Sequence, residues 1–234
     1  MAVKHSSRSH AKLSASSSAR WMACPPSAKL NAEIPDVATD YAREGTCAHE
    51  LAEFKVNRLL GIESADPTEN LDYFDQEMAD CTDDYAQYIA EQISKYSDPQ
   101  VLVEQRLDFS KYVPDGFGTG DCVIVANEVL TVIDYKHGKG VAVSAEHNSQ
   151  MMLYALGALE LFSSSSGFSS PPSLSGSSGL SSCGSSSSFS GSGFFSSKRI
   201  SSANPNSTAF LAFIHVSSLM SFEILLRDNP VFTA

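Results

Sequence analysis

The stretch GDCVIVANEVLTVIDYK, residues 120–136, decides the fold. It contains two runs rich in β-branched residues, 120–126 and 129–136, and the dipeptide Asn127-Glu128 between them leaves room only for a tight turn. A third run, at 101–109, comes earlier, and a turn rich in Pro, Asp and Gly joins it to the other two. These residues predict a meander of three strands, most simply an antiparallel one.

Helical patterns lie on both sides of this meander. Residues 45–60 place apolar side chains on one broad face, with Thr46 as the expected N-cap and Gly61 as the expected end. Residues 70–96 predict a second, acidic helix, and residues 145–162 predict a third helix after the strands. The order of helix, helix, three strands and helix predicts an α+β fold.

The two ends of the chain differ from this patterned part. Residues 1–13 are interpreted as a flexible basic arm, although a transit peptide has a similar composition, and a short helix carrying Trp21 follows. Residues 163–207 form a low-complexity tract rich in Ser and Gly, which predicts a disordered linker. Residues 208–234 are apolar again, and 209–216 are expected to supply a further strand.

Composition and charge exclude several classes of protein. No apolar run approaches the roughly 18 residues of a membrane span, and the N-terminus lacks the apolar core of a secretory signal. Five scattered cysteines argue against a disulfide framework and for a reducing compartment. The formal net charge of −11 argues against a protein that holds nucleic acid by bulk charge, but it leaves open an enzyme with a local groove and a metal ion.

Three side chains on neighbouring strands form a candidate catalytic cluster. Asp134 and Lys136 are two residues apart on one strand, so both point to the same face of the sheet. Asp121 begins the preceding strand, and counting outward from the Asn127 turn places it opposite Asp134. Two opposed carboxylates suit Mg²⁺ or Mn²⁺, and a nearby lysine can orient or deprotonate water and stabilise charge on a phosphate. The alternative is a surface ion pair at an exposed strand end.

The motifs around this cluster resemble those of the PD-(D/E)XK nuclease superfamily, in particular its RecB-like branch. The matching elements are Gly45-Thr46-Cys47-Ala48-His49, Gly120-Asp121-Cys122, Asp134-Tyr135-Lys136-His137-Gly138, Gln150 with Tyr154-Ala155-Leu156, and the leader Ser14-x-Ser16-x-x-x-x-Trp21-x-x-Cys24-Pro25. The likeness covers about residues 12–162 and resembles an uncharacterised group found in phages and prophages. It implies a restriction-endonuclease-like core over 14–162, with the C-terminal part of that group missing or altered here.

Transferred position by position, the resemblance implies a role for each matching residue. The catalytic residues would be Asp121, Asp134 and Lys136, and the metal ligands would be His49, Asp121, Asp134 and the carbonyl of Tyr135. Gln150 and Tyr154, one helical turn apart, would face the same groove and position DNA or the lysine.

Three of these positions have a second interpretation. Glu104, on the first strand, either joins the acidic cluster or faces solvent on an edge strand. His49 is either a metal ligand or a hydrogen-bonded histidine near the start of its helix. Tyr154 is either a positioning residue or a plain core residue.

Cys24 raises the question of an iron–sulfur cluster. In iron–sulfur members of the RecB-like branch, a cysteine at this place and three cysteines near the C-terminus hold a [4Fe–4S] cluster. Here Cys183 is the one cysteine in the C-terminal tract. The resemblance therefore implies a cluster ligand at Cys24 in full-length relatives, an incomplete cluster in this chain, and Mg²⁺ or Mn²⁺ as the cofactor.

The function that the resemblance implies is a metal-dependent DNA nuclease, which hydrolyses phosphodiester bonds in phage or prophage DNA processing or recombination. Its partners would be single- or double-stranded DNA, bound without sequence specificity, and phage recombination or replication proteins. Its location would be the cytoplasm of a bacterial host.

Two alternatives to an active nuclease stay open. One is a catalytically impaired DNA-binding or assembly module that keeps the nuclease-like core. The other is a truncated, non-functional product, because 22 of the 40 residues in 163–202 are serine and a reading-frame shift or damaged gene end would also give that change.

Overall fold

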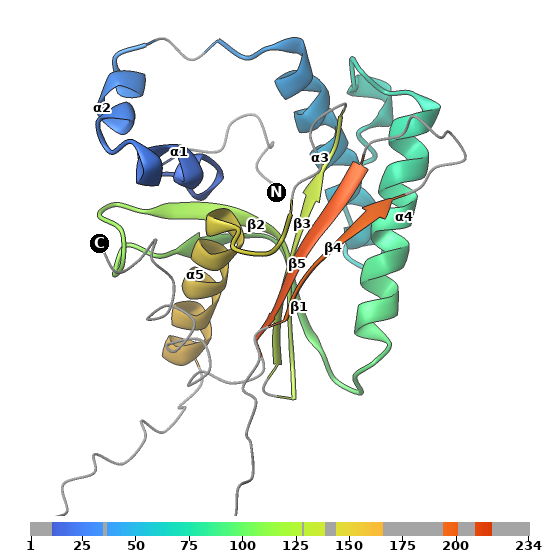
Figure 1. Cartoon of the computed structure of the whole chain (residues 1–234). Coiled ribbons are helices and arrows are strands. Elements are labelled where there is room, and N and C mark those ends of the chain that lie inside the picture. The colour runs from blue at the N-terminus through green and yellow to red at the C-terminus, as the bar shows by residue number, and fades with distance from the viewer. Residues whose placement is uncertain are drawn as a thin grey trace, which may run out of the picture.

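The computed structural model describes residues 11–34, 37–127, 129–138, 144–165, 194–200 and 209–216. The fold is α+β, as predicted, with helices packed against one antiparallel sheet (Figure 1). In chain order the elements are η2 (Ala15–Ser17), α1 (Ser18–Ala23), α2 (Pro26–Ala32), α3 (Asp40–Leu59), η3 (Thr68–Asn70), α4 (Gln76–Ile93), β1 (Gln100–Asp108), β2 (Phe117–Ala126), β3 (Val129–Lys136), α5 (Ser149–Ser165), β4 (Phe194–Ile200) and β5 (Ala209–Val216).

The sheet has five strands in the order β1-β2-β3-β5-β4, and every neighbouring pair is antiparallel. The meander β1-β2-β3 is therefore confirmed. Strand β5 pairs along the free edge of β3, with Asp134 opposite Ala212, so the further strand expected at 209–216 is confirmed as well.

Strand β4 is a correction to the sequence analysis. It pairs with β5 and lies inside 163–207, the tract predicted to be a disordered linker. The tract as a whole is rich in Ser and Gly, but one short segment of it pairs with the edge of β5. That segment is Phe194-Phe195-Ser196-Ser197-Lys198-Arg199-Ile200. Pairing with a neighbouring strand overrides composition here, since strand formation depends strongly on context. The remaining linker residues, 166–193 and 201–208, lie outside the described part.

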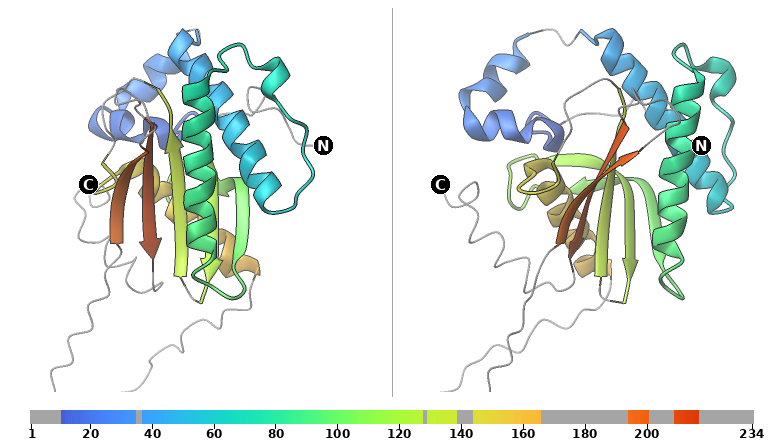
Figure 2. Two further views of the ribbon diagram at one scale, coloured as in Figure 1. Left: turned by 90° about the vertical axis from the view of Figure 1, so that its right-hand side faces the viewer. Right: turned by 45° about the vertical axis from the view of Figure 1, so that its right-hand side comes forward.

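Two helical layers cover the two faces of the sheet. Helices α3 and α4 lie side by side over one face, and α5 lies on the other, together with α1 and η2 (Figures 1 and 2). We call the buried apolar cluster on the first face the α3–α4 core, which includes Leu51, Val56, Met78, Tyr85, Ile89, Cys122, Ile124, Ile133 and Tyr135. The cluster on the second face is the α5 core, which includes Ala15, Leu107, Val123, Leu130, Val132, Met151, Leu153 and Leu156.

The ends of the helices differ from those predicted, and local capping explains the difference. Helix α3 begins at Asp40, because the Thr39 hydroxyl accepts a hydrogen bond from the Ala42 N–H at 3.2 Å. The expected cap, Thr46, instead lies within the helix and donates to the Ala42 carbonyl. Gly61 does end the helix, with a φ of 72° that favours glycine.

Helix α4 is also shorter than predicted. It begins at Gln76, where the Asp75 carboxylate accepts from the Met78 N–H at 2.7 Å. At the N-terminus, the helix that carries Trp21, α1, ends at Ala23, and Pro26 begins α2 at the first helical position, where proline is best tolerated. Within the described ranges, no helix is both long and apolar enough to cross a membrane.

Candidate metal centre and active site

The site forms where the β1–β2 pair bends. Glu104 and Asp121 fall opposite each other, between the paired positions Val103–Cys122 and Gln105–Gly120, but they are not themselves a pair of the ladder. Glu104 has a φ of 50°, in the left-handed region that non-glycine residues seldom adopt. Such backbone strain occurs preferentially at functional sites.

This backbone conformation reverses the facing of the side chains along β1. Leu102 and Leu107 both pack against the α5 core, although they are five positions apart and a regular strand would place them on opposite faces. The same reversal occurs in β2, where Val123 belongs to the α5 core and a Cβ on Gly120 would contact Leu107 of that core. Figure 1 shows the resulting bend, with β2 crossing above α5 before it turns into the sheet.

One half of the site, which we call the triad, consists of His49, Glu104 and Asp121. One ligand atom from each lies within 4.8 Å of the others, so the three could hold a metal ion. His49 comes from α3 and places its Nδ1 3.5 Å from Asp121 Oδ1. Both side chains are largely buried, with 18% and 10% of their surface exposed. The alternative in which Glu104 simply faces solvent is wrong, because the bend directs it into the cluster.

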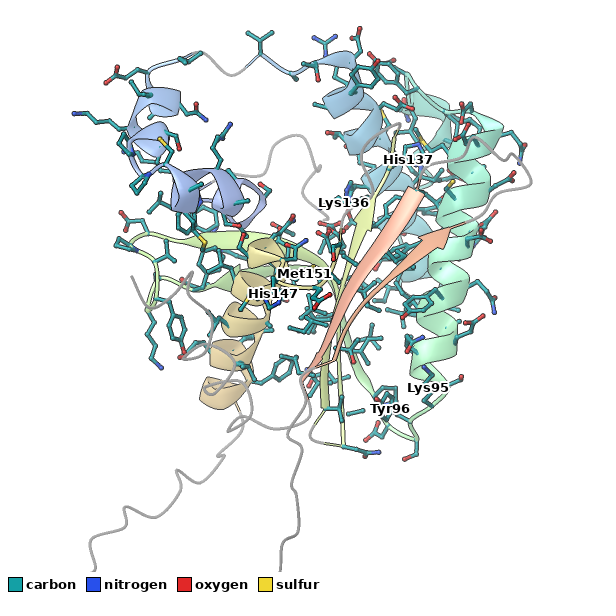
Figure 3. All side chains as sticks on the ribbon, in the orientation of Figure 1. Lys95, Tyr96, Lys136, His137, His147 and Met151 are labelled. Carbon is teal, nitrogen blue, oxygen red and sulfur yellow. The ribbon has the colours of Figure 1, made fainter. Side chains whose placement is uncertain are left out.

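The other half, which we call the lysine half, consists of Asp134, Lys136 and Gln150. Lys136 Nζ lies 2.7 Å from Asp134 Oδ2, and the Gln150 side-chain amide donates to Asp134 Oδ1 at 3.1 Å. The same amide reaches the Tyr154 hydroxyl at 3.2 Å, so the predicted pairing of Gln150 and Tyr154 along α5 is confirmed. Lys136 lies at the end of β3 in Figure 3, far from Lys95 and Tyr96 at the other end of the molecule.

The two halves meet through the backbone of β3. The β2–β3 ladder ends at Cys122 and Ile133, so Asp121 and Asp134 occupy the next opposed positions, as predicted. Just beyond that end, the N–H of Tyr135 donates to Asp121 Oδ2 at 2.7 Å. The Asp121 carboxylate therefore ties β2 to β3 and at the same time faces the His49 ring.

The charges of the site shift the pKa values of its two aspartates in opposite directions. Burial favours the neutral form of Asp121, but His49 and Lys136 outweigh it and lower the pKa of that carboxyl. Burial raises the pKa of Asp134; Lys136 opposes this rise, and the charge of Asp121 adds to it.

The pKa values of the two basic groups of the site, His49 and Lys136, shift in the same direction. Burial lowers the pKa of both, but nearby carboxylates outweigh burial and hold both values above the ordinary range. For His49 the main partner is Asp121, and for Lys136 it is Asp134. Lys136 therefore carries its positive charge at neutral pH.

These side chains line a pocket of about 180 Å³. Its walls are formed by Ala11, Ser14, Ala15, Ser16, His49, Glu104, Phe117, Gly118, Thr119, Asp121, Asp134, Lys136, Gln150 and Tyr154. A Cβ on Gly118 would lie 2.7 Å from the Tyr154 ring, so glycine is needed there to let the two approach. Tyr154 is thus both a buried core residue and part of the pocket wall.

Sequence reasoning noticed the N-terminal motif but missed its place in this pocket. The Trp21 indole N–H donates to the Ser14 carbonyl at 3.0 Å, and the hydroxyls of Ser18 and Ser149 are 2.6 Å apart in the core. These bonds fix the segment containing Ser14 and Ser16 beside α5. The sequence signal for this placement was the spacing between Ser14 and Trp21, and the hydrogen bond between these two residues explains that spacing. Of the predicted flexible arm, residues 1–10 lie outside the described part, and residues 11–13 lie against this wall, since Leu13 packs against the α5 core.

Three other predicted site residues, Asp134, Tyr135 and Cys24, lie outside the triad. Asp134 lies outside the triad, because its carboxylate is engaged by Lys136 and Gln150. The ring of Tyr135 is buried in the α3–α4 core, and its hydroxyl pairs with His137 Nδ1 at 3.0 Å, while the role of its backbone carbonyl as a metal ligand stays a prediction. Cys24 is exposed and belongs to no group of three donors among the described residues, and Cys183 lies outside them.

The donor set of the triad fits a divalent cation. Two carboxylates and one imidazole combine hard oxygen ligands with one nitrogen, and all three groups are partly or largely withdrawn from solvent. The carboxylates would otherwise repel each other across the bend. The triad therefore is a possible metal site, and its chemistry does not by itself identify the ion.

Comparison with known proteins gives a family without an assigned activity. No solved structure matches the chain. A family model described as "Protein of unknown function (DUF2800)" matches residues 10–169, which is more than half of the chain and contains both the triad and the lysine half. The chain therefore belongs to the DUF2800 family.

Proposed function

We propose that this protein is a metal-dependent DNA nuclease of the RecB-like PD-(D/E)XK type. The observation that carries the proposal is the convergence of the triad and the lysine half on one pocket. The side chains come from α3, β1, β2, β3 and α5, and so from both faces of the sheet. A chance surface ion pair would not recruit five elements to the same buried place.

The triad supports the metal-dependent part of the proposal. His49, Glu104 and Asp121 would hold Mg²⁺ or Mn²⁺, and the bound cation would polarise a phosphodiester and activate water. The position of Asp121 is fixed, because its other oxygen accepts a hydrogen bond from the Tyr135 N–H.

The lysine half supports the hydrolytic part. Lys136 retains its charge through the ion pair with Asp134, so it would stabilise negative charge on the phosphate and orient water. Gln150 holds Asp134 from the opposite side, which fixes the position of the ion pair. These roles match the order of the motifs that resemble the RecB-like branch.

The pocket also supports the choice of substrate. Three carboxylates line the pocket and would repel a negatively charged phosphate. A bound cation and Lys136 are therefore needed for a phosphate to enter. The hydroxyl-bearing residues of its N-terminal wall, Ser14 and Ser16, carry no charge and would tolerate a nucleic-acid backbone. We assign DNA processing or recombination by a phage or prophage, in a bacterial cytoplasm, as the setting of this activity.

The direct experiment is incubation of the full chain with linear double-stranded and single-stranded DNA in the presence of Mg²⁺ or Mn²⁺. Cleavage is expected with at least one of the two metals and none with EDTA. The variants Asp134→Ala and Lys136→Ala should cleave at least about 10²-fold more slowly while melting cooperatively. Cleavage that persists unchanged in either variant would remove the assignment.

A second candidate is a DNA-binding module that binds metal without turnover. It is favoured by one observation, the position of Asp134, which lies outside the triad and is held by Lys136 and Gln150. Mn²⁺ binding and DNA binding without any cleavage would select this candidate over the nuclease.

A further inference from the structure

Tyr85, on α4, carries a buried polar atom that the fold itself does not explain. Its side chain is 2% exposed, and within the described part of the chain its hydroxyl has no hydrogen-bond partner. Buried hydroxyls are normally paired, because an unpaired one loses its bonds to water and gains none in return. An orphaned hydroxyl of this kind has room for a further partner, such as a water molecule, an ion or a ligand bound to an ion.

The position of Tyr85 connects it to the triad. Its ring packs against the Tyr135 ring at 5.0 Å between centroids, and the Tyr135 ring packs edge-on against His49 at 5.6 Å. Tyr85 also belongs to the same buried cluster as Cys122, the neighbour of Asp121 on β2.

The charged groups that act on Tyr85 include two members of the triad. Burial is the main cause that raises the pKa of Tyr85, and the negative charges of Asp121 and Glu104 add to it. The ring contact with Tyr135 and the shared cluster with Cys122 place Tyr85 in the part of the α3–α4 core that adjoins these two residues. Tyr85 is not among the residues that line the pocket, so it lies behind the triad, on the α4 side.

We propose that Tyr85 is a positioning residue of the metal site, and that its hydroxyl donates to a carboxylate of the triad when a divalent cation is bound. A carboxylate that binds a cation through one oxygen has lone pairs left for an outer hydrogen bond, and such outer partners fix the ligand in place. The aromatic packing with Tyr135 holds the Tyr85 ring, so the cation-bound carboxylate would move to meet a hydroxyl whose ring is already fixed. This inference rests on the metal site of the proposed function.

The test is the variant Tyr85→Phe, measured with Mn²⁺ alone. Thermal melting in EDTA is expected to show unchanged or higher stability, because the hydroxyl removed has no partner in the metal-free protein. Calorimetric titration is expected to show Mn²⁺ affinity weakened by about ten-fold or more, the usual effect of losing an outer partner of a metal ligand. The EPR spectrum of bound Mn²⁺ should also change.

Tyr88→Phe is the matched control. Tyr88 lies on the same helix and is also buried, at 6% exposure, but Glu91 is the charged group that acts on it rather than the triad. Its loss should leave Mn²⁺ affinity within about three-fold of wild type. An unchanged Mn²⁺ affinity in Tyr85→Phe would overturn the inference, whatever its melting temperature. Failure of the wild-type protein to bind Mn²⁺ would instead overturn the metal site itself.

Discussion

The triad and the lysine half form one pocket, but they are built from different faces of the sheet. Helix α3 supplies His49 to the triad, and α5 supplies Gln150 to the lysine half. Asp121 and Asp134 occupy opposed positions on neighbouring strands, yet the pKa of the first is lowered and that of the second is raised. The difference shows that the charged partners of each carboxylate, rather than its position on the strand, set the direction in which its pKa shifts.

The largest effect is expected from Asp121→Asn, which removes one charge of the triad without changing its shape. Mn²⁺ binding should fall below detection in calorimetry, and cleavage should fall by about 10³-fold or more, since the cation contributes several kcal/mol to stabilising the transition state. The Tyr135 N–H keeps an oxygen acceptor in this variant, so cooperative melting should persist. Mn²⁺ binding of wild-type strength would contradict the assignment of the triad.

Lys136→Ala should separate the two halves. The ammonium group is lost from the reacting phosphate, so cleavage should fall by about 10²–10³-fold. Mn²⁺ affinity should change little or rise, because a positive charge near the triad is removed. Parallel titration and cleavage assays give both numbers, and a large loss of Mn²⁺ affinity would show that the two halves are not distinct.

Gln150→Ala should have a smaller effect on the lysine half. It removes the bonds to Asp134 and Tyr154 but leaves the Lys136–Asp134 ion pair. We expect about a ten-fold loss of kcat with Mn²⁺ affinity unchanged, because the variant disturbs the placement of a charged group without removing it. Gln150→Glu is the comparison variant, since it adds a charge beside Asp134 and should be worse than alanine.

The smallest effects concern the stability of the two helices that supply the site. Gly157, within α5, lies against β1, and a Cβ there would be 2.9 Å from Leu107 Cβ and 3.1 Å from its backbone carbonyl carbon. Gly157→Ala should therefore destabilise the protein by about 1–3 kcal/mol.

Gly45, within α3, is the matched case, because nothing lies within 4 Å of its Cβ position. Gly45→Ala should stabilise the protein by about 0.5–1 kcal/mol, the usual gain in a helix interior. Urea denaturation measures both variants. Equal effects of the two substitutions would show that α5 is not packed more closely than α3.

The strand meander and the opposition of Asp121 and Asp134 followed from sequence, because a two-residue turn fixes the register of the strands it joins. The place of Glu104 did not follow, because counting alternate residues assumes a regular strand and Glu104 has a left-handed backbone. The start of α3 was missed because Gly45 resembles a boundary, while Thr39 provides the cap. Strand β4 was missed because its neighbour in the sheet, and not its own composition, determines its conformation.

The most direct test of the account is a crystal structure of the protein grown with Mn²⁺, with anomalous diffraction used to locate the metal. The account predicts an anomalous peak bounded by His49, Glu104 and Asp121, with Lys136 beside it and still close to Asp134. A map with no peak in the pocket, or with the metal held elsewhere by other residues, would contradict the central claim that the bend of the β1–β2 pair builds a cation site.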